Sequence, residues 1–395
     1  MSFQRPSSPR TARTILIVAC GSQLAMRAWA QDVGATLNGS VRDARGAPLA
    51  GVSVDVRHEP TGYLVRGTTN DAGRYALFGL PLGGPVTVTA RRLGYRQVER
   101  TGFMMAIGSR VEVNIVLHPV SVVLGTVLVH ADSGTGREER IGGSTRVDRE
   151  RIDALPVLTR SFAALSSVAP LTGAQFSLGG QRWTSTDFRL DGAQHRNMFR
   201  AGEASGGPAA LPMDAVREFE VNTAVFDVAQ GRQGGGQIAA ATREGTNTVV
   251  GRAFTSYRSE KIAASVDFQG RDRTARQATV RQSGISVGGP IVRDRAHFFA
   301  AYEREDSDET LYTGDVSTPQ GQVTAGINRD SLTRVLSILG RLYGADTTIA
   351  QLGRLDRSPR SQTILGRIDW QLTPAHRFTL RGTASGWSRD RKSVV

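Results

Sequence analysis

Residues 364–384 alternate between two kinds of side chain with a period of two, and this alternation constrains the fold more than any other feature of the sequence. The apolar set comprises Ile364, Gly366, Ile368, Trp370 and Leu372. The intervening set comprises Leu365, Arg367, Asp369 and Gln371. After the turn letters PAHR, Phe378, Leu380, Gly382 and Ala384 alternate with Arg377, Thr379, Arg381 and Thr383. Because successive side chains of a strand point to opposite faces, the segment predicts an antiparallel hairpin with one apolar and one mainly polar face.

A second hairpin is predicted at residues 284–303, which read GISVGGPIVRDRAHFFAAYE. One apolar face would carry Ile285, Val287, Gly289 and Ile291, then Phe298, Ala300 and Tyr302, with His297 and Glu303 opposite. The turns at 293–295 and 373–376 are short, whereas the polar segments 258–278 and 304–361 are long. Strands of about ten residues, with short turns at one rim and long loops at the other, are typical of outer-membrane β-barrels. A soluble antiparallel sheet with one wet face shares the same alternation.

The longer polar segment contains a predicted helix near residues 330–343. Its apolar stripe comprises Leu332, Val335, Leu336, Leu339 and Leu342. We expect Asp330 or Ser331 to cap its N-terminus and Gly344 to end it. No apolar run in the chain reaches the roughly 18 residues that a membrane-spanning helix needs.

The letters Gly284-Ile285-Ser286-Val287-Gly288 match the G-x-S-x-G pattern of a hydrolase nucleophile elbow. That motif requires a strand, a sharp turn and then a helix. Pro290 and the β-branched Ile291 continue an extended chain instead, so we expect Ser286 to be an ordinary strand residue. Cys20 is the only cysteine, and the six histidines have no zinc-hydrolase spacing. The sequence therefore predicts no catalytic residue, metal site or cofactor.

The formal net charge is +13, and all but Lys261 and Lys392 of the 49 basic residues are arginine. Clustered basic residues indicate nucleic-acid binding. Here the arginines are scattered among acidic residues and form no basic run, so a nucleic-acid partner is not predicted.

Residues 1–30 are typical of a secretory signal peptide. Three arginines without an acid precede a short apolar stretch, and the small residues Ala28 and Ala30 form an A-x-A site. The expected cleavage lies between Ala30 and Gln31. An alternative reading is a lipoprotein site at Cys20, although the apolar stretch before it is short for that purpose.

Residues 31–120 contain about seven short alternating segments between turn signals, which predicts a β-sandwich. Val52, Val54 and Val56 share one face of one such segment. The letters GSVRDARGAPLAGVSVDV, then TTNDAGRYALFGLP and a later LGY, resemble the carboxypeptidase regulatory-like domain. The resemblance implies a non-catalytic, transthyretin-like or Ig-like module, which serves either as a partner-binding surface or as a rigid spacer.

Residues 121–140 form a linker that contains a strand-like segment, GTVLVHA. These letters are similar to the TonB box, a segment that adds a strand to the sheet edge of a partner protein. The resemblance implies partner-binding roles for Thr126, Val127, Leu128, Val129, His130 and Ala131. The alternatives are a last strand of the sandwich or a linker strand.

Residues 141–250 combine helix and strand patterns with glycine-rich turns. Asp148 is expected to cap a short helix that Leu155-Pro156 ends, and a second helix is expected at 161–170. The segment resembles the α+β plug of TonB-dependent receptors of the Oar-like type, through L-P-x-x-x-R-x-F, the L-D-G at Leu190–Gly192, and AVREFEVNTAVFDVAQGRQGGGQI followed by TREGTN. Gly234-Gly235-Gly236 lacks the lysine of a phosphate loop and is expected to be a turn.

Residues 251–395 resemble the first strands of an incomplete outer-membrane barrel, because GGPIVRDRAHFFAAYE is similar to an Oar-like hairpin. The resemblance implies a mainly β outer-membrane receptor with three partners: a TonB-type energy-transducing protein, outer-membrane lipid, and a small ligand such as a siderophore, glycan or peptide. Because a large barrel needs several hundred residues, we expect the reading frame to continue past Val395. The alternative is a secreted or surface-attached adhesion protein that binds through the sandwich and transports nothing.

Overall fold

The computed structural model describes residues 34–120, 127–130, 143–155, 166, 168–173, 177–181, 186–194, 211–223, 236–259, 276–312, 316, 319–344 and 354–390. Over these ranges the chain is mainly β and forms four sheets. The predicted cleavage site at Ala28, Ala30 and Gln31 lies outside the described residues, as do Thr126 and Ala131.

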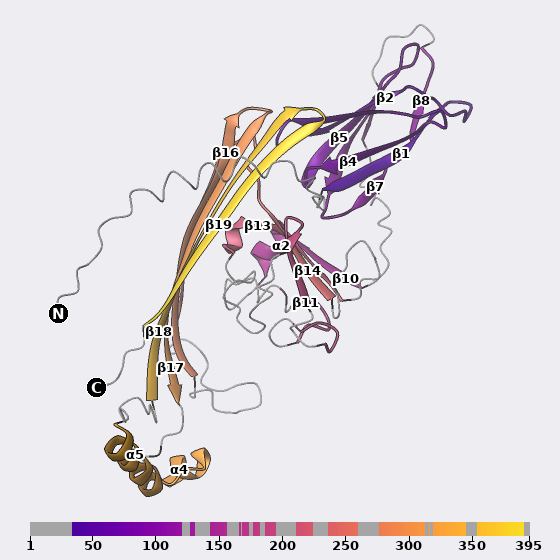
Figure 1. Cartoon of the computed structure of the whole chain (residues 1–395). Helices are drawn as coiled ribbons and strands as arrows, with labels where there is room; N and C mark the ends of the chain where they lie inside the picture. The colour runs from indigo at the N-terminus through magenta and orange to yellow at the C-terminus, as the bar shows by residue number, and fades with distance from the viewer. Residues whose placement is uncertain are drawn as a thin grey trace, which may run out of the picture. The chain divides into compact units, whose positions relative to one another are not determined.

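The N-terminal sandwich consists of two sheets (Figure 1, indigo to purple). One sheet has the order β4-β1-β7, with β8 also paired to β1, and the other has the order β3-β2-β5-β6-β9. The strands are β1 (Ala35–Asp43), β2 (Ser53–His58), β3 (Tyr63–Thr68), β4 (Arg74–Leu80), β5 (Gly83–Arg91), β6 (Val98–Met105), β7 (Arg110–Glu112), β8 (Ile115–Leu117) and β9 (Val127–His130). Val52, Val54 and Val56 lie in the core between the sheets, as the alternation predicted.

Strand β9 comprises the described part of the TonB-box-like segment. It pairs in parallel with β6, with Val127 opposite Val98 and His130 opposite Thr101. It is the last strand of its sheet, which agrees with the alternative that this segment closes the sandwich. The binding of a partner by this segment stays a prediction.

The next assembly along the chain is a separate sheet, which we call the second sheet because it follows the sandwich. It combines short strands with helical turns. Its elements are β10 (Ser144–Asp148), α2 (Arg149–Ala154), β11 (Thr186–Leu190), β12 (Ala193–Gln194), η5 (Met213–Ala215), β13 (Val216–Asn222) and β14 (Gly236–Thr242), and the strand order is β10-β13-β14-β11-β12. Asp148 caps α2 as predicted, because its carboxylate accepts a 2.9 Å hydrogen bond from the Arg151 backbone N–H. The helix predicted at 161–170 and the turn at Gly234-Gly235 lie largely outside the described residues.

The third assembly, which we call the long sheet, is a meander of five antiparallel strands in sequence order (Figure 1, β16–β19, orange to yellow). The strands are β15 (Val250–Arg258), β16 (Arg276–Val292), β17 (Ala296–Tyr312), β18 (Arg354–Thr373) and β19 (His376–Asp390). The short turns at 293–295 and 373–376 are confirmed. The expected strand length of about ten residues is wrong, since β16 to β19 have 15 to 20 residues.

The long polar segment predicted at 304–361 is therefore shorter, because β17 continues to Tyr312 and β18 begins at Arg354. The reason is that the ladder is formed by backbone groups, and polar side chains oppose each other across it without ending the strands. Arg360, for example, lies directly opposite Asp306.

The predicted faces of the long sheet are confirmed. Phe299, Ala301 and Leu365 are buried against the second sheet. The alternate positions point away from it, and their exposed side chains include Ile285, Ile291, Ile364, Ile368, Trp370, Leu372, Phe378 and Leu380. Ser286 is buried within β16, which continues unbroken to Val292, so the strand–turn–helix geometry of a nucleophile elbow does not form here.

The described residues between β17 and β18 include two helices, α4 (Pro319–Ala325) and α5 (Arg329–Tyr343). Gly344 ends α5 with a left-handed φ of 60°, as predicted. The predicted N-cap at Asp330 or Ser331 is wrong, because Asn328 is the cap: its side-chain oxygen accepts hydrogen bonds from both of those backbone N–H groups. Among the described residues, no helix combines the length and apolar character needed to cross a membrane.

Candidate functional site at the interface of the second sheet and the long sheet

The second sheet packs its core against the inner face of the long sheet. Phe219, Val221 and Ile238 are completely buried together with Leu365 of β18, and Phe299 of β17 joins the same cluster. The alternation of β17 and β18 places these two long-sheet residues on the side that faces the second sheet. Around this apolar centre lie charged side chains from both sheets.

Glu244 is the centre of the charged group. It lies just after β14, is only 8 % exposed, and forms ion pairs with Arg377 at 2.7 Å, Arg217 at 3.3 Å and Arg367 at 3.6 Å. Burial by itself raises the pKa of Glu244, but the three arginines outweigh burial and hold that pKa below its ordinary value. Glu244 therefore carries a negative charge that ties the second sheet to β18 and β19.

Asp369 is the matching acid on the long sheet, and it is 1 % exposed. Arg367 donates to both of its carboxylate oxygens, at 2.7 and 3.0 Å. Arg377 and the Thr379 hydroxyl donate to the same carboxylate at 2.9 and 2.7 Å. Arg367 also donates to the Thr242 carbonyl at 2.8 Å, so this guanidinium bridges the two sheets directly.

Asp191 supplies a third acid, from the L-D-G motif. Its backbone adopts a left-handed φ of 46°, a conformation that aspartate tolerates better than most residues. Its carboxylate accepts hydrogen bonds from the Thr242 backbone N–H at 2.7 Å and the Thr242 hydroxyl at 2.6 Å. It also pairs with Arg381 of β19. We call the whole group the ionic cluster: Asp191, Arg217, Glu244, Arg367, Asp369, Arg377 and Arg381.

A separate set of charges joins the second sheet to β15. Arg149 of α2 pairs with Asp153 and, at 3.3 Å, with Asp214. Arg252 of β15 donates to Asp153 at 2.7 Å. Glu303 of β17 adds one more bridge, because its carboxylate accepts from the Met213 backbone N–H at 3.0 Å.

The β2–β3 hairpin of the sandwich contacts the same end of the long sheet. The Tyr63 hydroxyl donates to the Asp369 carbonyl at 3.0 Å, and it lies 3.0 Å from Nδ1 of the buried His297. The Arg377 guanidinium lies 5.2 Å from the centre of the Tyr63 ring, which is a cation–π distance. Gln371 exchanges two hydrogen bonds with the backbone of Leu64.

The sandwich also contacts the second sheet through a buried carboxylate. Glu218 of β13 pairs with Arg146 at 2.8 Å and accepts from the Ile107 backbone N–H at 3.3 Å. Burial nevertheless raises the pKa of Glu218 to about 7, because desolvation outweighs the attraction of Arg146. This contact is therefore sensitive to pH near neutrality.

Chemically, the interface is a set of ion pairs and hydrogen bonds between the second sheet and the long sheet. Among the described residues, no group of three or more His, Cys, Asp or Glu side chains is arranged to hold a metal ion. Each acid of the ionic cluster is matched by arginine, so the cluster fastens one sheet to another.

Sequence reasoning identified the faces but missed this interface. The alternation places Arg367, Asp369, Arg377 and Arg381 on the polar face of their hairpin, and Asp191 belongs to the L-D-G motif, but neither pattern indicates a partner for these side chains. The signal available was a set of charged side chains at inward positions, next to the letters LDG and TREGTN. The predicted partner-binding residues Val127 to His130 lie in the sandwich sheet instead.

Two segments of the chain match protein families. Residues 36–118 match the carboxypeptidase regulatory-like domain, and residues 241–351 match the outer membrane beta barrel domain. The first match covers β1 to β8, and the second begins at the end of β14 and extends through β15, β16 and β17.

The chain is also similar to a curated relative over nearly its whole length. It is 25 % identical to the TonB-dependent transporter Oar of Myxococcus xanthus, in an alignment that covers 97 % of this chain and 40 % of the relative. The chain thus spans about two fifths of the length of that relative, whose name describes a transporter. This similarity and the barrel-family match support a location in a Gram-negative outer membrane.

Solved structures with partial similarity include two receptors and a dioxygenase. The siderophore receptor PirA from Acinetobacter baumannii is 16 % identical over 62 % of this chain and 32 % of its own, with a TM-score of 0.39. A mutant of the ferric enterobactin receptor PfeA from Pseudomonas aeruginosa is 16 % identical over 62 % and 33 %, with a TM-score of 0.42. Catechol 1,2-dioxygenase from Pseudomonas arvilla C-1 is 17 % identical over 23 % and 54 %, with a TM-score of 0.19.

Proposed function

Starting from the similarity to the transporter Oar, we propose that this chain is part of a TonB-dependent receptor of the outer membrane. In this proposal, the second sheet belongs to a plug and the long sheet is a segment of the barrel wall. A small ligand, such as a siderophore, glycan or peptide, passes when the plug moves, and a periplasmic energy-transducing protein drives that movement. The adhesion alternative gains no support from the family matches or from the relative.

The ionic cluster is the observation that carries this proposal. A plug must be held firmly at rest and must also be able to leave the wall. Separating the second sheet from β18 and β19 would expose Glu244, Asp369 and four arginines, and water solvates such groups well. The cost of parting is therefore smaller than for an apolar interface of equal area, while the charges still define one resting position.

We propose further that β9 and its flanking residues receive the energy-transducing partner. Strand β9 ends the sheet order β3-β2-β5-β6-β9, so it has a neighbour on one side in the described sheet. A terminal strand presents backbone donors and acceptors on its other side, which can pair with a strand of another protein. The segment also precedes the plug in the chain, so a force that the partner applies to β9 would be transmitted along the backbone to the plug.

The test compares Val127→Pro with Val127→Ala in cells that depend on ligand uptake by the receptor. Proline removes one backbone N–H and disturbs strand pairing, whereas alanine keeps the N–H and changes only the side chain. We expect the proline variant to lose uptake while still fractionating with the outer membrane, and the alanine variant to retain most of its uptake. Unaltered uptake by the proline variant would exclude the role of β9. Soluble or loosely attached wild-type protein would contradict the receptor assignment itself.

A further inference from the structure

The outward face of the long sheet changes character within three successive rows of side chains. In the first row, Tyr302, Ile364 and Ala384 lie opposite one another on β17, β18 and β19. The next row contains Arg304, Gln362 and Gly386, and the one after it contains Asp306, Arg360 and Ser388. An apolar band of exposed side chains begins at Ile364 in the first row and continues towards the short turns with Ile368, Trp370, Phe378 and Leu380.

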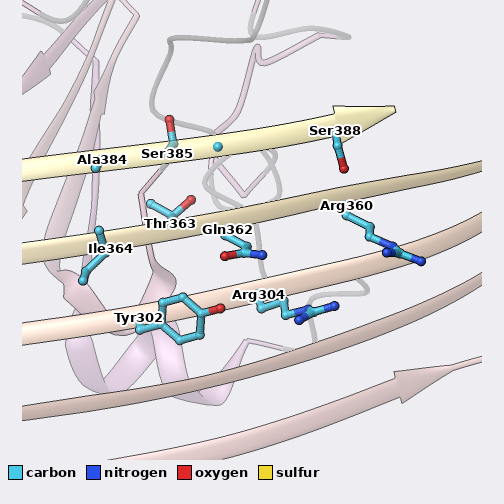
Figure 2. Close-up of a pocket in the computed structure, with 10 residues that line it drawn as sticks. Tyr302, Arg304, Arg360, Gln362, Thr363, Ile364, Ala384, Ser385 and Ser388 are labelled. Carbon is cyan, nitrogen blue, oxygen red and sulfur yellow. The ribbon is translucent and has the colours of Figure 1, made fainter. Parts of the chain in front are cut away.

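These rows border an open groove, which we call the outer groove. Figure 2 shows the side chains of Tyr302, Arg304 and Arg360 along neighbouring strands of the groove, with Ile364 at the end where the apolar band begins. The volume of the groove is about 760 Å³. Its floor at β19 is low because Gly386 has no side chain, and a Cβ added there would meet nothing within 4 Å.

The charged side chains among the residues that line the groove are two arginines, Arg304 and Arg360. Arg304 donates to both oxygens of Asp306, at 2.8 and 3.1 Å, and Arg360 lies 3.7 Å from the same carboxylate. Arg281, directly opposite Asp306 on β16, stacks over Tyr257 at 5.8 Å. Three arginines thus surround one acid, and the side chains of Arg304 and Arg360 remain 42 % and 58 % exposed. Their remaining donors are open to a further acceptor.

We propose that the outer groove binds the phosphorylated headgroup of a membrane lipid, whose acyl chains lie along the apolar band. This inference rests on the proposed function for the orientation of the long sheet in a bilayer. Arginine favours phosphate because its planar guanidinium presents paired N–H donors. Tyr302 lies where aromatic residues gather in membrane barrels, at the boundary between hydrocarbon and headgroup. An anionic amphiphile matches both ends of the groove, whereas a soluble anion matches only one.

The orientation of the groove identifies the leaflet. The apolar band lies towards the short turns, and the arginines lie towards the segment that contains α4 and α5. Short turns face the periplasm in bacterial barrels and long loops face the outside. The groove therefore lies at the outer leaflet, and the phosphate is the headgroup of a lipid in that leaflet.

The experiment measures binding of phosphatidic acid to the purified chain in neutral detergent by native mass spectrometry. Diacylglycerol with the same acyl chains lacks the phosphate, and inorganic phosphate lacks the chains. We expect phosphatidic acid to bind at least about tenfold more tightly than either, since two charge-assisted contacts and chain burial act together. The variant Arg304→Gln/Arg360→Gln should lose that advantage. The control Arg334→Gln/Arg341→Gln removes the same charge from α5 and should bind like the wild type.

A second variant keeps the inference testable if the double substitution disturbs folding. Gly386→Leu adds a side chain at a position where a Cβ would meet nothing within 4 Å, and it leaves all arginines in place. It should also weaken phosphatidic acid binding. Equal binding by wild type and by folded Arg304→Gln/Arg360→Gln would overturn the proposal, as would equal binding of inorganic phosphate and phosphatidic acid. Insertion of the wild type into phosphatidylcholine vesicles is measured separately. Failure to insert refutes the barrel assignment, whereas normal insertion without preference for phosphatidic acid refutes the headgroup site.

Discussion

Glu244→Gln should loosen the second sheet from the long sheet, because it removes one buried charge and keeps the shape of the side chain. Breaking a buried ion pair costs about 3–5 kcal/mol when the partner is left uncompensated. In this variant Arg367 and Arg377 still form ion pairs with Asp369. Arg217 loses its ion pair with Glu244, in which the two groups lie 3.3 Å apart. We therefore expect a cost at or below the low end of that range, about 2 kcal/mol.

Hydrogen exchange of the β14 amides measures this cost locally, because β14 is the strand that leads into Glu244. A loss of about 2 kcal/mol corresponds to roughly 30-fold faster exchange through local opening. Arg377→Gln combined with Glu244→Gln should cost less than the sum of the single variants, since the two side chains lie 2.7 Å apart. Glu59→Gln is the control, because the exposed Glu59 pairs with Arg57 only at 3.7 Å. Exchange within twofold of the wild type for Glu244→Gln, or full additivity in the double variant, would refute the reasoning.

Four further predictions address other parts of the chain. Burial raises the pKa of Glu218 from 4.5 to about 7, so its contribution to stability is full below pH 4.5 and is lost as the pH rises through 7. Glu218→Gln should remove this pH dependence of the unfolding free energy, which is on the order of 3 kcal/mol. Midpoints of thermal unfolding that change with pH equally in variant and wild type, between pH 4.5 and 8, would contradict this prediction. Tyr63→Phe removes the hydrogen bond to the Asp369 carbonyl and should cost about 1 kcal/mol in urea unfolding, with an unchanged midpoint as the contrary result. Asn328→Ala removes the cap of α5 and should destabilise that helix by about 1 kcal/mol, seen as faster amide exchange confined to its first turn. Exported protein should begin at Gln31, which N-terminal sequencing measures, and a mature chain that begins at a lipidated Cys20 would contradict it.

The regular parts of this fold were predictable because each depends on local periodicity. The hairpin at 364–384 shows its two faces in the sequence, and Asp148 and Gly344 are recognisable helix ends. The predicted strand lengths were wrong because the polar letters of one strand do not show whether a neighbouring strand extends far enough to pair with it. Arg360 continues β18 because Asp306 of β17 and Ser388 of β19 extend the backbone ladders on its two sides.

The ionic cluster was beyond sequence reasoning for a similar reason. Asp191, Glu244 and Arg377 are far apart in the chain, and each has many possible partners in an arginine-rich sequence. Their pairing is decided by how the second sheet packs on the long sheet, through the apolar cluster that contains Phe219 and Leu365. Alternation shows that a charge points inward, but the partner depends on tertiary packing.

The strand order of the second sheet has a mechanical consequence. β10 is the first described element after β9 in the chain, and it is the terminal strand of the order β10-β13-β14-β11-β12. Tension applied at β9 would therefore enter the second sheet at a strand held by one ladder of five residue pairs, Ser144–Asp148 against β13. That ladder can separate while β13, β14 and β11 stay paired, so the load reaches the sheet at a terminal strand. The ionic cluster, which is anchored on residues around β14, would yield only afterwards.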